Sequence, residues 1–225
     1  MTLATIFDCD GVLVDSEILG LEVELAALAE LGVHADLDDY MARCLGLTGP
    51  AWYALIERDY FAVHNRLLPG EFRSTCEERY RAAMASDRLV EVSGAREFVA
   101  RLACPKAVAS SSSIRSLENK LRRTGMWDHF TPHVYSGENV QRGKPEPDLF
   151  LHAAHCLGID PERCLVIEDS INGVRAARAA GMRVWGFVGG SHLKNRTGDH
   201  LLDAGAERTF GAWQDAASLS PFNRG

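Results

Sequence analysis

The sequence has few features of an extracellular, membrane-bound or metal-cluster protein. Its six cysteines form no C-x-x-C pair and no zinc-ligand spacing, which favours free thiols in a reducing compartment over disulfides or a zinc site. No apolar run approaches the length of a bilayer span, and no basic segment followed by a long apolar stretch opens the chain. Internal repeats and low-complexity tracts are also missing. We therefore expect a cytoplasmic globular protein.

An excess of positive charge is missing too. The chain has 24 Lys and Arg residues against 31 Asp and Glu residues, a net charge of -7. Nucleic acids and anionic membranes require a basic face, so we expect neither as a partner. With 225 residues, the chain has room for one domain with a smaller inserted one, but not for a second full enzyme domain. We expect a monomer rather than an obligate oligomer.

Two carboxylates follow the first apolar run of the chain. Residues 5–7 read as a buried strand that stops at Asp8, Asp10 and Gly11. Side chains two apart on an extended chain face the same way, and open α/β sheets bind ligands at the carboxyl ends of their strands. One carboxylate could therefore attack a substrate while its neighbour moves a proton. The alternative is an Asp-rich turn with solvated acids.

A run of four serines, residues 110–113, follows a second apolar run at residues 107–109. The pattern then predicts a helix from Ile114 to about Arg123, closed by Gly125. Hydroxyls and free backbone N–H groups at the start of a helix can hold a phosphate. A helix cap followed by a loop is the other interpretation.

One lysine, Lys144, lies in a proline-rich loop at residues 143–147, ahead of a predicted helix over 148–157. A single fixed ammonium group could neutralise a transferring phosphoryl group. The alternative is an ordinary surface lysine.

Adjacent acids follow a further strand-like run. Residues 165–167 end in Glu168 and Asp169, ahead of a helical pattern over 173–180 that Gly181 stops. Carboxylate oxygens are the ligands that Mg²⁺ prefers, which predicts a magnesium site. Solvated acids favoured by the dipole of a helix N-terminus are the alternative.

Taken together and in this order, the four segments resemble the four motifs of the haloacid dehalogenase (HAD) superfamily. The resemblance runs from about residue 3 to residue 210, and residues 8–17 and 143–148 are most similar to the β-phosphoglucomutase and sugar-phosphate phosphatase branch. It implies an α/β fold, a doubly wound parallel sheet with a HAD-like Rossmann core, and a small helical cap domain inserted between the first and second motifs.

The resemblance also implies roles for the site residues. Asp8 would be the nucleophile that forms an aspartyl-phosphate, and Asp10 the acid that protonates the leaving group and then activates water. The catalytic set is completed by Lys144. The implied Mg²⁺ ligands are Asp8, Asp10 through its backbone carbonyl, Glu168 and Asp169. The implied phosphate-binding groups are Ser110, Ser111 and Lys144.

The helical pattern between the first two motifs gives the expected domain boundaries. We expect residues 1–14 and 93–225 to form the catalytic core and residues 15–92 the helical cap. Cap helices are predicted over 19–31, over 37–45, from Thr48 and Pro50 onward, and over 71–85. Core strands are predicted near residues 107, 133, 165, 184 and 209. Residues 14–17 and 91–94 are the expected hinges, which would let the cap close over substrate.

Departures from the mutase pattern favour a phosphatase. β-Phosphoglucomutases carry a histidine in the first cap helix, where this chain has Gly20, and an arginine where Gly49 follows Gly46-Leu47-Thr48. An arginine fork suits a second, non-transferring phosphate, although Arg43, Arg73 or Arg79 could replace it. We therefore expect hydrolysis of a small phosphorylated sugar or sugar acid, with phosphomutase activity as the runner-up.

Two functions of other classes are the alternatives. A dehalogenase of the same fold would need neither Asp10 nor the acids at 168–169. A catalytically silent binding module, similar to a receiver domain, would be about half this length and would carry its acids earlier. A silent member that keeps the motifs stays open, because fold alone does not establish turnover.

The sequence also suggests roles for several residues outside the four motifs. Asn172 could hold a metal-bound water or cap a helix, and Cys9 is expected in the core. The eight histidines share no spacing that suggests a site. Trp52 and Tyr53 are expected to pack in the cap core rather than line a substrate pocket. Residues 191–200 are expected to form a loop near the site entrance.

Overall fold

The computed structural model describes residues 4–44, 49–194 and 196–216. The chain divides into two compact units, the first made of residues 1–17 and 89–225 and the second of residues 18–88. The boundaries expected from the sequence were residues 15 and 92, and the role of the inserted unit as a cap stays a prediction. The segment Gly46-Leu47-Thr48, used above to compare phosphatases with mutases, lies outside the described residues.

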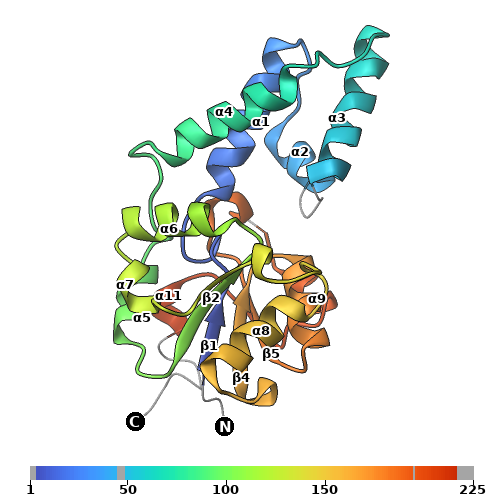
Figure 1. Cartoon of the computed structure of the whole chain (residues 1–225). Helices are drawn as coiled ribbons and strands as arrows, with labels where there is room; N and C mark the ends of the chain where they lie inside the picture. The colour runs from blue at the N-terminus through green and yellow to red at the C-terminus, as the bar shows by residue number, and fades with distance from the viewer. Residues whose placement is uncertain (1–3, 45–48, 195, 217–225) are drawn as a thin grey trace. The chain divides into compact units, whose positions relative to one another are not determined.

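A six-stranded parallel sheet forms the centre of the first unit (Figure 1). The strand order is β3-β2-β1-β4-β5-β6, and each neighbouring pair is parallel. The strands are β1 Ala4–Phe7, β2 Lys106–Ser110, β3 Val134–Ser136, β4 Cys164–Glu168, β5 Arg183–Phe187 and β6 Thr209–Phe210. Since β2 and β4 lie on opposite sides of β1, the direction of winding reverses at β1. The predicted doubly wound parallel fold is therefore confirmed.

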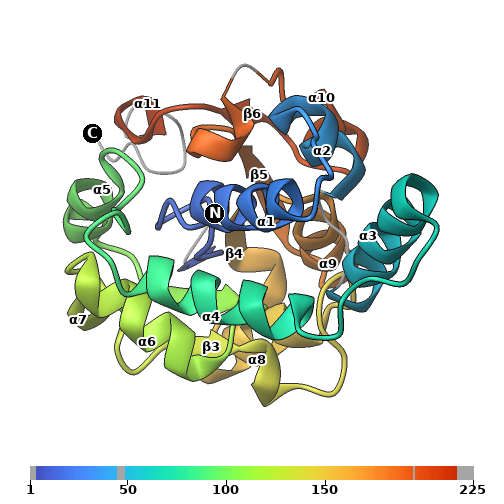
Figure 2. The same ribbon diagram turned by 90° about the horizontal axis from the view of Figure 1, so that it is seen from above.

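Side chains that alternate along the strands give each face of the sheet its own core. On one face, Ile6 belongs to a hydrophobic cluster with buried residues of α8 (Asp148–Leu157) and α9 (Ile171–Ala179). On the other face, Phe7 contacts Phe98 of α5 (Ala95–Arg101) and Trp213 of α11 (Trp213–Ala216). Figure 2 shows these two pairs of helices on opposite sides of the sheet.

Shorter elements complete the first unit. They are α6 Ile114–Arg123, α7 Trp127–Phe130, α10 Asp199–Asp203 and the 3-10 turns η1 Gly137–Asn139, η2 Pro161–Arg163 and η3 Ser191–Leu193. The segment predicted as a loop over 191–200 begins with the short turn η3 and ends in the first two residues of α10. Its place near a site entrance stays a prediction.

The described part of the second unit is helical, as predicted. Its helices are α1 Glu17–Glu30, α2 Leu37–Cys44, α3 Gly49–His64 and α4 Phe72–Met84. Tyr40 is almost fully buried, and its hydroxyl donates to Glu24 at 2.8 Å and accepts from the Trp52 indole at 2.7 Å. Trp52 also stacks on Phe72, with 6.1 Å between ring centroids. These contacts place Trp52 in a packing role.

The two chain connections between the units pair with each other. Val14 and Glu91 form an antiparallel bridge. The Asp15 N–H donates to the Val90 carbonyl at 3.0 Å, and the Val92 N–H donates to the Leu13 carbonyl at 2.9 Å. The residues expected as hinges therefore include a short two-stranded ribbon that belongs to the first unit.

No helix in the described ranges combines the length and the apolar character that a membrane crossing requires. The six cysteines are all free, and Cys9 is fully buried.

Candidate active site

The loop after β1 carries the first two acids. Strand β1 is completely buried, and the Asp8 N–H continues its pairing with β4 by donating to the Ile167 carbonyl at 2.9 Å. Asp8 is therefore fixed at the carboxyl end of the strand where the winding of the sheet reverses, the position where such sheets bind ligands. Both acids are largely buried, so the alternative of a turn with solvated acids was wrong.

Gly11 allows this loop to turn close beneath the acids. Its φ of +74° lies in the left-handed region, and a Cβ atom there would lie 1.9 Å from Asp169 Oδ2 and 2.5 Å from His192 Cε1. Any side chain would therefore both strain the backbone and overlap the neighbouring acid.

Lys144 lies between two of the predicted acids. Its Nζ donates to Asp8 Oδ1 at 2.5 Å, to Glu168 Oε1 at 2.7 Å and to the Ala109 carbonyl at 3.0 Å. Only 5% of its side chain is exposed, so it is not the surface lysine considered as the alternative. Burial alone favours the neutral amine, but the carboxylates of Asp8 and Glu168 raise the pKa of Lys144 above its usual range. Lys144 is therefore an ammonium group at neutral pH.

A second cluster surrounds Asp10. Ser112 donates to Asp10 Oδ2 at 2.7 Å, and Ser110, at the end of β2, lies 3.3 Å from the same oxygen. Ser16 and Lys120 both donate to Asp10 Oδ1. Burial opposes ionisation of Asp10, but the ion pair with Lys120 and these hydrogen bonds lower its pKa.

The serines of the run at residues 110–113 make different contacts. Ser110 and Ser112 contact Asp10, whereas Ser113 caps helix α6 by accepting from the Ser116 N–H at 3.3 Å. Ser111 is exposed. Its predicted role as a phosphate ligand through its N–H group stays a prediction.

The acids after β4 are buried rather than solvated, so the simple helix-terminus interpretation was wrong. Glu168 is fully buried, and its Oε2 accepts from the N–H and the hydroxyl of Ser170, each at 2.9 Å. The Ser170 hydroxyl also caps α9 by accepting from the Gly173 N–H. The N-cap of α9 is therefore Ser170, not Asn172.

Asp169 has a buried oxygen without a hydrogen-bond partner, Oδ2. His192 Nε2 lies 3.2 Å from that oxygen, and the histidine is 4% exposed. Burial, followed by the charges of neighbouring acids, raises the pKa of Asp169 well above its usual range. Burial also raises the pKa of Asp8, although the charge of Lys144 opposes the shift.

The donor set suits a hard divalent cation. As the side chains are placed in the described ranges, no group of three or more His, Cys, Asp or Glu residues forms a metal cage. However, Mg²⁺ requires only one or two carboxylates and keeps several waters. The Asp169 oxygen Oδ2, which accepts no hydrogen bond and lies 3.2 Å from His192 Nε2, and the raised pKa values of two buried acids are what a site prepared for a cation would show. The residues present fit Mg²⁺.

Three residues of the site were not found from the sequence: Ser16, Lys120 and His192. Lys120 had a detectable signal, because it shares a helical stripe with Leu117 and Leu121, which are both buried. A lysine on an apolar stripe implies a buried partner. Ser16 lies in an irregular segment and His192 in the three-residue turn η3, and neither is long enough for a periodic pattern to mark an inward-facing residue.

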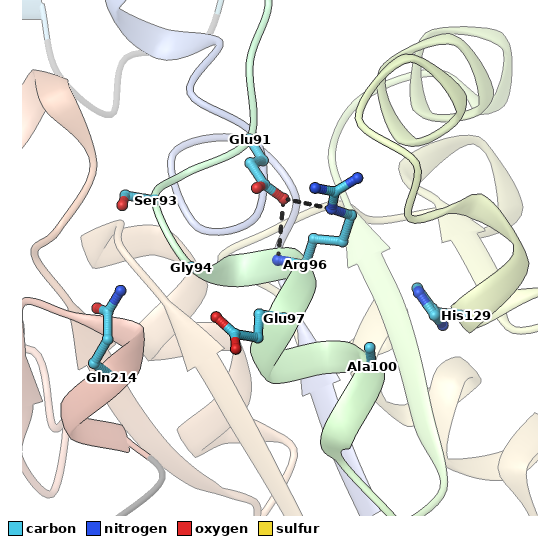
Figure 3. Close-up of a pocket in the computed structure, with 8 residues that line it drawn as sticks. All are labelled: Glu91, Ser93, Gly94, Arg96, Glu97, Ala100, His129 and Gln214. Atoms are coloured by element: carbon cyan, nitrogen blue, oxygen red, sulfur yellow. Dashed lines mark hydrogen bonds and ion pairs between the residues drawn. The ribbon is translucent and has the colours of Figure 1, made fainter.

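A separate surface hollow of about 610 Å³ lies beside α5 (Figure 3). Glu91, Arg96 and Glu97 contribute charged groups to it, and Glu91 pairs with Arg96. None of the predicted site residues lines this hollow. It is therefore distinct from the acid clusters.

Comparison with known proteins adds independent information. A sequence model of the haloacid dehalogenase-like hydrolases matches residues 3–181. Hexitol phosphatase B of Escherichia coli (strain K12) is 35% identical over 195 residues, which cover 80% of this chain and 81% of that protein. The 6-phosphogluconate phosphatase of the same organism is 28% identical over 194 residues, 85% of each chain.

A solved structure is similar over almost the whole chain. The HAD family hydrolase from Deinococcus radiodurans R1, solved with bound phosphate and sodium, has a TM-score of 0.84 and 35% sequence identity, covering 97% of this chain and 95% of that one.

Proposed function

Because this chain belongs to the haloacid dehalogenase-like hydrolase family, we propose that it is a Mg²⁺-dependent phosphatase that acts on a small phosphorylated metabolite, a sugar or sugar-acid phosphate. The observation that carries the proposal is the bridge of Lys144 between Asp8 and Glu168 at the switch point of the sheet. It places one ammonium group against the proposed nucleophile, among acids that suit a cation.

In the proposed reaction, a carboxylate oxygen of Asp8 attacks phosphorus, and the bond from phosphorus to the ester oxygen breaks. Asp10, which would take up a proton as the phosphate dianion binds beside it, gives that proton to the departing alkoxide, which leaves as the alcohol, and the phosphoryl group stays on Asp8 as an aspartyl-phosphate. Asp10 then takes a proton from a water molecule that attacks phosphorus. Inorganic phosphate leaves and Asp8 is restored.

Lys144 and Ser110 are proposed to hold the phosphoryl oxygens, because the Lys144 ammonium group contacts Asp8 and the Ser110 hydroxyl contacts Asp10. Charge stabilisation by such fixed donors is commonly the largest contribution to phosphoryl transfer. When bound, Mg²⁺ would offset the repulsion between the phosphate dianion and the acids. Asp8, the Asp10 carbonyl and Asp169 would hold it, with Glu168 nearby but already engaged by Lys144 and Ser170.

The substrate class is supported by the relatives, whose names specify a hexitol phosphate and 6-phosphogluconate. Within residues 18–88, the three arginines considered as grips for a second phosphate each pair with a carboxylate. Arg43 pairs with Asp59, Arg73 with Glu77 and Arg79 with Glu30.

The test is an assay of the purified protein against a panel of sugar and sugar-acid phosphates, scoring free phosphate and phosphosugar isomers together. We expect free phosphate with Mg²⁺, none with excess EDTA, and none from Asp8→Asn or Asp10→Asn. Isomer without free phosphate would identify a mutase. Phosphate release that survives in Asp8→Asn would reject the aspartyl-phosphate mechanism.

A further inference from the structure

Lys120 is a buried lysine on a helix whose other basic residues are exposed. It lies on α6, where Arg122 and Arg123 face solvent, yet its own relative exposure is 0%. Lysines are almost never fully buried unless an acid compensates them. Since its ammonium group is inaccessible, Lys120 cannot contact a substrate directly.

The acid that compensates Lys120 is Asp10. Lys120 donates to Asp10 Oδ1 and, at 3.1 Å, to the hydroxyl of Ser112, which in turn donates to Asp10 Oδ2 at 2.7 Å. Together with Ser16 on Oδ1 and Ser110 on Oδ2, both carboxylate oxygens have donors. The Asp10 side chain is therefore held from three segments: the loop after β1, the end of β2 and helix α6.

The two buried lysines of the site contact different acids. Lys144 contacts Asp8, Glu168 and a backbone carbonyl, whereas Lys120 contacts Asp10 and Ser112. Each of the two proposed reacting carboxylates thus has its own ammonium partner.

We propose that Lys120 is a positioning residue for Asp10, fixing the orientation in which this carboxylate meets the leaving group and later the water. The inference rests on the proposed phosphatase activity. Replacing a buried ion pair by apolar residues is often neutral or stabilising, so a buried lysine here is more readily explained by placement of Asp10 than by stability. The reacting groups of a site must be held closely, because a displacement of about 1 Å can cost roughly 100-fold in rate.

The experiment compares two esters that differ in their need for a proton donor. A sugar phosphate releases an alkoxide, which must be protonated, whereas 4-nitrophenyl phosphate releases a phenolate that leaves readily without a proton. The parameter kcat/KM covers the steps up to formation of the aspartyl-phosphate, where Asp10 acts as the acid. We expect Lys120→Met to lower kcat/KM about 100-fold for the sugar phosphate and less than about tenfold for the aryl ester.

Lys106→Met is the matched control. Lys106 lies at the opposite end of β2 and donates to the Val99 and Leu102 carbonyls at 3.0 and 2.8 Å. Loss of this lysine should leave the ratio of the two kcat/KM values unchanged. Lys120→Arg, which keeps the charge, should recover part of the activity on the sugar phosphate. Equal losses on both esters in Lys120→Met, or no loss, would overturn the proposal.

A double variant and a crystal structure of Lys120→Met separate loss of positioning from a folding defect. If Lys120 acts through Asp10, adding Lys120→Met to Asp10→Asn should change the remaining kcat/KM for the aryl ester by less than about twofold. A further tenfold fall would overturn the proposal. The crystal structure of Lys120→Met should show the Asp10 carboxylate turned from its position, and an unchanged carboxylate would also overturn it. If wild-type protein released phosphate from neither ester, the proposed function would fail, and this structural test would still decide the role of Lys120.

Discussion

The two aspartates of the first loop should respond in opposite directions to the same substitution. The structure gives Asp8 a raised pKa, because burial and the neighbouring acids outweigh Lys144. It gives Asp10 a lowered pKa, because Lys120 and the serine donors outweigh burial. In the metal-free protein at pH 7, Asp8→Asn should therefore stabilise the fold and Asp10→Asn should destabilise it.

The contacts set the expected size of each effect. In Asp8→Asn, the amide oxygen can still accept from Lys144. The variant therefore keeps this hydrogen bond and loses the negative charge that the neighbouring acids repel. We expect a gain of about 1–2 kcal/mol in the free energy of unfolding, the usual size of a single stabilising substitution. In Asp10→Asn, one oxygen becomes an NH₂ group and faces two donors. Losing two hydrogen bonds to a charged group costs about 3 kcal/mol.

The sign of the pH dependence follows from the same shifts. Ionised Asp8 destabilises the folded protein above the ordinary pKa of an aspartate, and this cost disappears once the pH falls below it. Ionised Asp10 stabilises the folded protein above the ordinary pKa, and the contribution is lost as the pH falls through the lower folded-state pKa. Both differences from wild type should therefore shrink as the pH approaches about 3, where unfolded aspartates are protonated.

The assay is thermal unfolding of the three proteins in EDTA at pH 7, repeated at lower pH and then with Mg²⁺. For a chain of this size, 1 kcal/mol shifts Tm by about 2–4 °C. We expect Asp8→Asn to melt a few degrees above wild type and Asp10→Asn about 6–12 °C below it, from the same scaling. Added Mg²⁺ should raise the Tm of wild type more than that of Asp8→Asn, because a ligand stabilises the state that binds it. If the Tm values of Asp8→Asn and Asp10→Asn in EDTA shifted from wild type in the same direction, the reasoning would be refuted.

Three further predictions concern single residues. Lys144→Met should lower kcat/KM by roughly 100-fold or more, since it removes a fixed charge at the reacting group; a loss below tenfold in steady-state kinetics would contradict this role. Burial and nearby charges raise the pKa of Glu17 to about 7 from an ordinary 4.5, so wild type should lose about 3 kcal/mol of stability between those pH values. Urea unfolding of Glu17→Gln should lack that loss, and an unchanged pH dependence would reject the shift. Gly11→Ala should abolish phosphate release and lower Tm, because its Cβ would lie 1.9 Å from Asp169; an active, equally stable variant would show that the loop is not so constrained.

The sheet and the positions of its polar ends could be predicted from the sequence because parallel strands buried on both faces are nearly continuous apolar runs. Residues 107–109 and 165–167 are such runs, and both are fully buried in β2 and β4. The serine run follows residues 107–109 directly and the acid pair 168–169 follows residues 165–167, so topology alone brings these residues to one edge of the sheet. Lys144 lies instead in the loop ahead of α8.

The partners of individual acids could not be predicted in this way. Pairing Asp10 with Lys120 requires a contact between residues 110 positions apart, and it depends on the inward turn of one side chain of α6. His192 approaches Asp169 only because Gly11 and Gly190 leave room for it. Such choices are made by packing across several segments, and local propensity does not record them.

The ribbon formed by Val14 and Glu91 allows the inserted helices to be exchanged during evolution. The backbone leaves the first unit and returns to it at two adjacent points, joined by hydrogen bonds within that unit. The entropy cost of closing a loop between these two points grows only slowly with the length of the loop. The sheet therefore does not depend on the length of the inserted segment. The helical segment can thus be exchanged for another of different length without rebuilding the strands that carry the acids.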